Sequence, residues 1–140
     1  MIENTELLNL IRQNVQMGID GIKLVIDDTD SEAFTTELKR QMDEYGDIYS
    51  EADNLLDCFN GEKRDVNAAV KIATHLSGKI KSLSGSVSKV AESMIQGSTM
   101  GVTKLIQHLN DFMGDQRVRN LAERLVVTEE NNIEALKQFL

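Results

Sequence analysis

The chain has 140 residues and a formal net charge of −8, and 41% of its residues are hydrophobic while only 4% are aromatic. This length and apolar content suit one globular domain and exclude a disordered chain, while the acidic balance argues against nucleic-acid binding, which needs a basic surface. The sequence contains no proline, and because proline disrupts helix interiors, its absence favours long helices over a turn-rich β fold.

The charge is unevenly distributed. Residues 27–57 include eleven acidic and two basic residues, whereas residues 60–90 include six basic and two acidic ones. Two solvated helix faces explain this pattern most simply, and electrostatic pairing between subunits is the alternative. The sequence does not separate the two interpretations.

Targeting and redox signals are sparse. A single cysteine, Cys58, excludes an internal disulfide. The first residues, Met1 to Asn4, do not form a basic region followed by an apolar stretch, so we expect no signal peptide. No apolar run reaches the roughly 18 residues that a membrane span requires. We therefore expect a cytoplasmic protein with no membrane association.

Apolar residues recurring at three- and four-residue intervals predict a helix over about residues 3–27 and a second helix that ends near residue 59. Thr29 and Glu32 have capping-box spacing at the start of the second helix. Asn60 and Gly61 are typical of the left-handed turn that ends a helix.

The next stretch, about 65–83, keeps the helical period after a candidate N-cap at Asp65, but it is rich in serine and glycine. Because these residues weaken a helix, we expect a kink or break near residues 84–86. A third helix over about 87–113 and a fourth over 116–140 follow, separated by Gly114-Asp115. The connection about 60–86 then joins two helical hairpins, each closed by a short loop.

This layout predicts an all-α fold with a single domain over residues 1–140. One long crossover between two hairpins is the topology of a ferritin-like four-helix bundle. We therefore expect such a bundle with a long, partly helical connection between its second and third helices.

Three segments strengthen this expectation. They are the run from Gln41 to Tyr45, the run from Met94 to Gly101, and the ending from Glu129 to Leu140. Together they resemble small bacterial proteins of the ferritin-like class, and the ending is similar to the last helix of rubrerythrin-like proteins. In that helix a Glu-x-x-His pair precedes a Leu-x-x-(Phe/Tyr)-Leu close. The resemblance implies the fold more than an activity.

A ferritin-like di-iron site needs inward glutamates on two helices and an inward Glu-x-x-His on each of the other two. Here Glu129 and Asn132 lie on the inward stripe, so asparagine occupies the histidine position. The other inward polar residues are Gln41, Tyr45 and Ser98. One inward carboxylate and no inward histidine cannot hold two irons. We therefore expect a polar core cluster of these five residues, with no metal and no cofactor.

His75 supports a different hypothesis. Histidine phosphotransfer domains are also helical bundles, and they carry an exposed histidine with a glycine one turn later. The segment from Ala73 to Gly78 matches this only in part, because Gly78 follows three residues after His75 instead of four. Short motifs of this kind are weak evidence, and an ordinary surface histidine is the simpler explanation.

Two other features have structural interpretations. Gly97 and Gly101 have Gly-x-x-x-Gly spacing, and we expect them to make room for Tyr45 or Tyr49. Cys58 lies off the apolar stripe, and a lone thiol of this kind is only weak evidence for catalysis.

The sequence thus favours a structural or protein-binding bundle over an enzyme, and we expect it to form a homo-oligomer or to bind another protein. A metal-binding or oxidoreductase protein of the ferritin class with non-standard ligands is the first alternative. A phosphotransfer module acting through His75 is the second.

Overall fold

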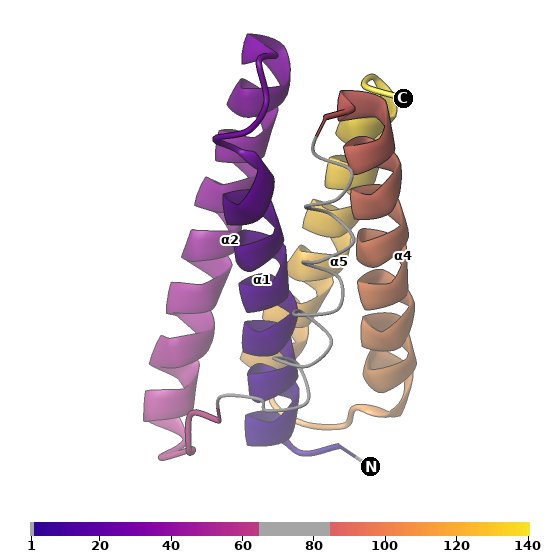
Figure 1. The fold of residues 1–140 in the computed structure, drawn as a ribbon. Coiled ribbons are helices and arrows are strands. Elements are labelled where there is room, and N and C mark those ends of the chain that lie inside the picture. Colours follow the sequence, from indigo (N-terminus) through magenta and orange to yellow (C-terminus); the bar gives the residue numbers. More distant parts are fainter. Residues whose placement is uncertain (1, 65–84) are drawn as a thin grey trace.

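A computed structural model describes residues 2–64 and 85–140 of the chain. These residues contain four α-helices and no strand, so the all-α prediction is confirmed (Figure 1). The helices are α1 (Asn4–Val25), α2 (Glu32–Cys58), α4 (Val87–Asp111) and α5 (Gln116–Lys137). Each ends one to three residues before its predicted C-terminal limit, as is usual where helix ends fray.

Side chains at three helix starts explain where the helices begin. The hydroxyls of Ser31 and Ser86 and the carboxylate of Asp115 accept hydrogen bonds from the backbone N–H groups of Phe34, Lys89 and Arg117. Such N-caps satisfy donors that have no partner within the helix.

The predicted capping box at Thr29 and Glu32 is wrong. Ser31 is the cap of α2, and the Thr29 hydroxyl instead accepts from the Ser31 N–H. Ser86 likewise caps α4 from an extended backbone. The helix predicted over about 65–83 lies outside the described residues, so the break expected near residues 84–86 stays a prediction.

The end of α2 follows the predicted chemistry. Asn60 has a φ of 52°, in the left-handed region that asparagine and glycine tolerate. The N–H of Gly61 then reaches back to the Leu56 carbonyl over 2.8 Å. This closes the helix by a left-handed turn, with Asn60 in place of the more usual glycine. Asp65, a predicted N-cap, lies outside the described residues.

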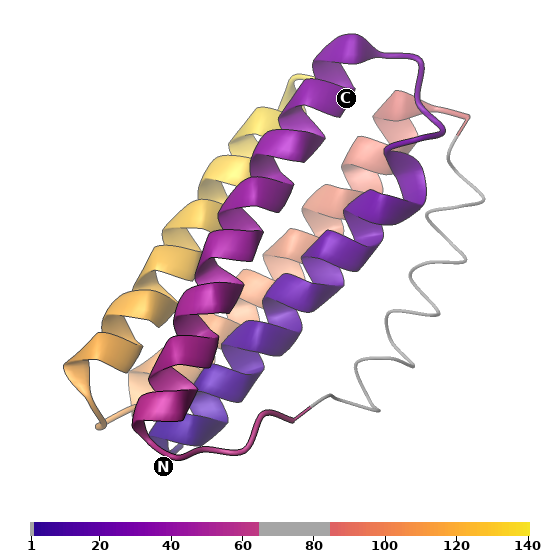
Figure 2. The ribbon, with the colours of Figure 1, turned by 90° about the vertical axis from the view of Figure 1, so that its left-hand side faces the viewer.

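The helices form two antiparallel hairpins, α1 with α2 and α4 with α5, as their short connecting loops predict (Figure 1). α2 ends beside the N-terminus, whereas α4 begins at the opposite end of the bundle, near the C-terminus. α2 and α4 therefore run in the same direction. Figure 2 shows the same arrangement from the side, with α5 behind α2 and α4 behind α1.

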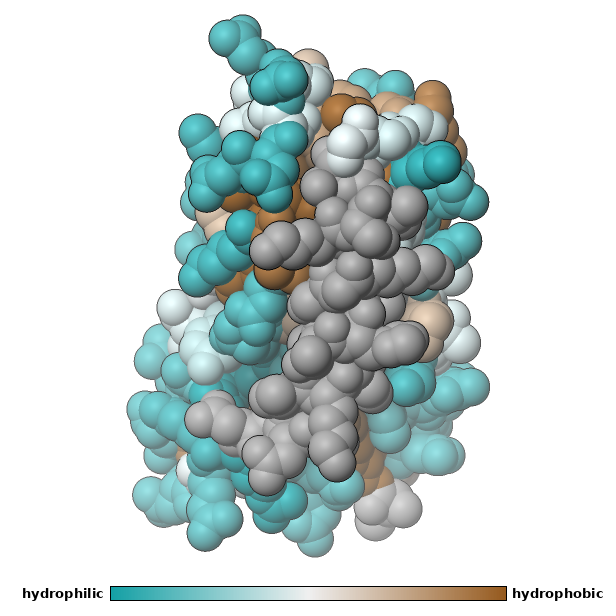
Figure 3. All heavy atoms as spheres, viewed as in Figure 1, coloured by the Kyte–Doolittle hydropathy of each residue, from teal (hydrophilic) through white to brown (hydrophobic). Residues whose placement is uncertain are grey.

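One hydrophobic core lies between the helices. α2 packs against α5 as well as α1, and α1 also contacts α4 and α5. The fully buried side chains come from all four helices, and hydrophilic residues cover most of the described surface on the face drawn in Figure 3. The largest buried apolar residues are Phe34, Phe112, Leu7, Leu8, Ile11, Ile22, Leu38, Ile48, Leu56, Leu125 and Leu136.

Two glycines mark where a helix backbone approaches a side chain closely. A Cβ at Gly18 of α1 would lie 2.7 Å from Cε2 of Tyr45, so the tyrosine ring lies directly on the α1 backbone. A Cβ at Gly101 of α4 would meet Asn14 of α1 at 2.8 Å, and one at Gly97 would meet nothing within 4 Å. The prediction that Gly97 and Gly101 make room for Tyr45 or Tyr49 is therefore wrong, because Gly18 does so for Tyr45.

Candidate functional site: two buried polar clusters

Glu129 is an acid inside the bundle. Its side chain, from the middle of α5, is 2% exposed. Its polar neighbours are Tyr45 of α2 and the half-buried Ser98 of α4. Burial raises the pKa of Glu129, because it penalises the charged form, and the hydrogen bonds from Tyr45 and Ser98 oppose this rise without cancelling it. We call Glu129, Tyr45, Ser98, Asn132 and Gln41 the Glu129 cluster.

Tyr45 is held between two helices. Its ring lies against Gly18 of α1, and Glu129 of α5 is the acid close enough to affect its hydroxyl. Burial, followed by the negative charge of Glu129, raises the pKa of Tyr45 well above its usual value. The phenol is therefore neutral over the physiological range and acts only as a hydrogen-bonding group.

Asn132 connects this cluster to the surface. It lies one helical turn beyond Glu129 and is fully buried. Its Oδ1 accepts a hydrogen bond from Nη2 of Arg40 over 3.2 Å, whereas its Nδ2 has no hydrogen-bond acceptor. Arg40 also donates to Glu37 through Nε over 2.9 Å, and the Nε2 of Gln41 donates to Glu37 over 3.0 Å. The hydrogen bond from Arg40 is the main reason that the pKa of Glu37 is lowered.

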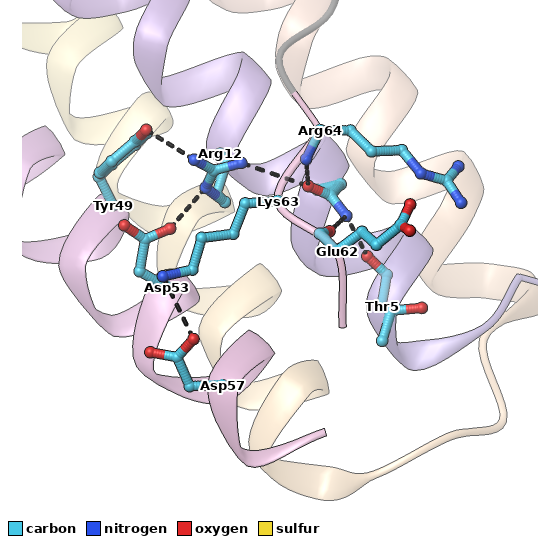
Figure 4. A network of polar contacts seen from close by, with 9 residues as sticks. Thr5, Arg12, Tyr49, Asp53, Asp57, Glu62, Lys63 and Arg64 are labelled. Carbon is cyan, nitrogen blue, oxygen red and sulfur yellow. Dashed lines mark hydrogen bonds and ion pairs between the residues drawn. The ribbon is translucent and has the colours of Figure 1, made fainter. Parts of the chain in front are cut away.

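A second cluster surrounds Arg12 of α1, which is 5% exposed (Figure 4). Its Nε lies 2.6 Å from Oδ1 of Asp53, its Nη2 donates to the Tyr49 hydroxyl over 2.8 Å, and its Nη1 donates to Oδ1 of Asn9 over 3.3 Å. The guanidinium carbon also lies 4.9 Å from the centroid of the Tyr49 ring. Both terminal guanidinium nitrogens therefore have hydrogen-bond acceptors, and Nε has an ion-pair partner in Asp53 without a hydrogen bond between them. We call Arg12, Asp53, Tyr49 and Asn9 the Arg12 cluster.

The Arg12 cluster holds the chain that leaves α2. Nδ2 of Asn9 donates to the Glu62 carbonyl over 2.8 Å, and Oδ1 of Asn9 accepts from the Arg64 N–H over 2.9 Å. Figure 4 shows Glu62 and Arg64 of this segment near Arg12. Since Asn9 also contacts Arg12, one polar cluster joins α1, α2 and residues 62–64.

Of the inward polar residues that the sequence singled out, Gln41, Tyr45, Glu129 and Asn132 are buried, and Ser98 is half-buried. Gln41 donates to Glu37, and Asn132 accepts from Arg40, so these two have partners outside the predicted set. Cys58 is exposed and His108 is half-buried. His75 lies outside the described residues.

The Arg12 cluster was not predicted, although a signal was present. Leu8, Ile11, Arg12 and Val15 follow the i, i+3, i+4, i+7 pattern of one buried helix face, and all four are buried. A charged residue at such a position indicates a buried partner, which the structure identifies as Asp53. Glu37 and Arg40, which were also missed, have the spacing of a helical ion pair.

The ligands of a di-iron centre do not fit here. Two hard cations need several carboxylates and imidazoles, but Glu129 is the only carboxylate in its cluster, and its contacts are hydroxyl groups. Within residues 2–64 and 85–140, no group of three or more histidine, cysteine, aspartate or glutamate side chains is placed to hold a metal ion. The cluster offers hydrogen-bond donors and acceptors and one ionisable group, the carboxyl of Glu129.

Comparison of the chain with family models, with characterised proteins and with solved structures gives no match. Among the helices that the structure describes, none is long and apolar enough to cross a membrane.

Proposed function

We propose that this chain is a ferritin-like four-helix bundle that lacks a di-iron centre and acts as a structural or protein-binding protein in the cytoplasm. The topology supports the first part of the proposal. Two antiparallel hairpins whose central helices, α2 and α4, run in the same direction are the arrangement that one long crossover produces in ferritin-like bundles.

The observation that carries the proposal is the environment of Glu129. A ferritin-like bundle binds metal through acids and histidines that converge on its core. Among residues 2–64 and 85–140, Glu129 is the one buried acid, and its polar neighbours are Tyr45, Ser98 and Asn132. This composition favours a polar core cluster over a metal-dependent oxidoreductase.

Exposed apolar side chains support a protein-binding role and a homo-oligomer. Met100 on α4 and Val127 on α5 are 58% and 56% exposed, although both lie in the middle of long helices. Single exposed apolar residues are ordinary on protein surfaces. The role of Met100 and Val127 therefore has to be tested by substituting them. Other exposed apolar residues are Ile106, Met113 and Leu140.

Elemental analysis of the purified protein tests the missing metal centre. Protein produced in medium containing iron, manganese and zinc should carry none of them in stoichiometric amount. About two metal ions per chain, lost in Glu129→Ala but kept in the exposed-site control Glu130→Ala, would overturn the proposal and support the oxidoreductase alternative.

Sedimentation velocity tests the oligomer separately. The parent chain should sediment as a dimer or larger species, and Met100→Glu combined with Val127→Glu should shift it toward the monomer. Gln107→Glu, at an exposed polar position on α4, is the matched control for added charge. A parent that sediments as a monomer at all concentrations would contradict the homo-oligomer.

A further inference from the structure

Asn60 and Gly61 form the one Asn-Gly pair in the sequence. Asparagine is thermolabile, and a following glycine has no side chain to hinder attack by its backbone nitrogen on the asparagine side chain. In that reaction the glycine nitrogen gives up its proton and bonds to Cγ of the asparagine, and Nδ2 leaves as ammonia. Water then opens the succinimide ring at either carbonyl, which leaves aspartate or isoaspartate. Asn60 is exposed to the water that this reaction needs.

The fold holds the nitrogen of Gly61 away from this reaction. Its N–H donates to the Leu56 carbonyl over 2.8 Å, and Asn60, with a φ of 52°, makes the left-handed turn that directs it there. A Cβ at Gly61 would lie 2.7 Å from Cγ2 of Thr5 and 2.8 Å from Cδ2 of Leu56, so the glycine backbone packs against two side chains. The nitrogen that must attack is therefore engaged as a donor and has little room to turn toward Asn60.

Asn9 of α1 holds the chain that follows Gly61. Nδ2 of Asn9 donates to the Glu62 carbonyl over 2.8 Å, and its Oδ1 accepts from the Arg64 N–H over 2.9 Å. Asn9 is 5% exposed, and Nη1 of Arg12 donates to the same Oδ1 over 3.3 Å, which fixes the orientation of the amide. Because Gly61 is bonded directly to Glu62, these contacts limit how far the Gly61 nitrogen can move.

We propose that Asn60 is a deamidation site that the contacts of Asn9 keep from reacting. When residues 62–64 leave Asn9, the Gly61 nitrogen separates from Leu56, attacks Cγ of Asn60 and expels ammonia. Aspartate adds a negative charge at the end of α2, and isoaspartate also adds a methylene group to the main chain within the turn. The turn that closes α2 does not re-form with isoaspartate, because its hydrogen bond depends on the spacing of main-chain atoms. The release of this segment from α1 thus becomes permanent.

Peptide mapping by mass spectrometry tests the proposal. The parent, Asn9→Ala and Lys63→Ala are incubated at mildly alkaline pH, and the parent is also incubated in urea. Deamidation at Asn60 should be slowest in the parent, about tenfold faster in Asn9→Ala because two hydrogen bonds are lost, and fastest in urea. Lys63→Ala removes only the exposed ion pair with Asp57, 3.2 Å long, and should keep the parent rate. A parent rate equal to that of Asn9→Ala, or to that in urea, would overturn the proposal.

A second measurement does not depend on how well the variants fold. Hydrogen exchange of the Gly61 amide in the parent reports how often its bond to Leu56 opens. Because deamidation requires the same opening, the fold should slow deamidation at Asn60, relative to urea, by a factor at least as large as that for Gly61 exchange. A smaller factor would overturn the proposal, since Asn60 would then react while that bond is still formed.

Discussion

The bundle contains two buried polar clusters that solve the same physical problem in different ways. In the Arg12 cluster a buried cation is matched by Asp53, and each guanidinium nitrogen has a partner. In the Glu129 cluster a buried acid has no cation, and its neighbours are neutral. The charge of Arg12 is compensated by Asp53 in the first cluster, whereas the second cluster contains an acid, Glu129, that has no such partner.

The comparison teaches that burial alone does not define a functional site. The contacts of the Arg12 cluster to residues 62–64 give it a structural role. In the Glu129 cluster no cation compensates the negative charge of the ionised acid. Substitutions should therefore affect the two clusters in different ways.

The largest expected effect is in the Arg12 cluster. Arg12→Ala leaves Asp53, whose side chain is 28% exposed, without its cation and removes the contacts to Tyr49 and Asn9. Breaking such a pair from one side costs about 3 kcal/mol of unfolding free energy, measured by urea denaturation. The double variant Arg12→Met with Asp53→Leu should recover much of this loss. A double variant no more stable than Arg12→Ala would show that packing, and not the unpaired charge, dominates.

The next effect concerns the support of Tyr45. Gly18→Ala places a methyl group 2.7 Å from the Tyr45 ring, and we expect overpacking to cost about 1–3 kcal/mol of unfolding free energy. Gly97→Ala is the matched control, because a Cβ there meets nothing within 4 Å. That variant should stabilise α4 by up to about 1 kcal/mol, since alanine favours helix more than glycine does. Equal effects of the two substitutions would contradict the close approach at Gly18.

A smaller effect distinguishes the two tyrosines. The Tyr49 hydroxyl accepts a hydrogen bond from a charged donor, Arg12, and Arg12 keeps its contacts to Asp53 and Asn9 in the variant. Tyr49→Phe should therefore cost about 1.5 kcal/mol of unfolding free energy. Thermal or urea unfolding measures this loss. Tyr49→Phe and Tyr45→Phe each remove a hydroxyl group and keep the ring. The difference between their unfolding free energies therefore compares the stabilisation that the two hydroxyls contribute. A larger loss for Tyr45→Phe would reverse the roles assigned to the two clusters.

The smallest expected effect on stability, and the sharpest on titration, is that of Tyr45→Phe. The Tyr45 hydroxyl hydrogen-bonds to Glu129 in a way that lowers the pKa of the acid. Removing it should therefore raise the pKa of Glu129 further, which ¹³C NMR of the carboxyl group can measure. An unchanged or lowered pKa of Glu129 would show that the hydroxyl does not stabilise the carboxylate.

The sequence predicted the helices because apolar spacing and cap chemistry are local properties. It identified Glu129 and Asn132 because polar residues on an apolar stripe stand out. It placed the cap of α2 at Thr29 instead of Ser31, since both residues suit an N-cap and only the backbone path decides between them.

Tertiary contacts account for what the sequence missed. The neighbour of Gly101 is Asn14 of α1, and the slot for Tyr45 is Gly18, because these pairings depend on how the helices are rotated and set against each other. Arg12 was overlooked because a charged residue is ordinarily assigned to the surface. Its partner Asp53 is 41 positions away in the sequence, and only the α1–α2 packing brings the two together.

Calorimetric titration of the metal-free protein with iron(II), manganese(II) and zinc tests the central claim most directly. The account predicts no saturable binding within the bundle, and the same heats for the parent, Glu129→Ala and Glu130→Ala. Binding of two metal ions per chain that Glu129→Ala abolishes and Glu130→Ala preserves would contradict it, because the Glu129 cluster would then be a metal centre.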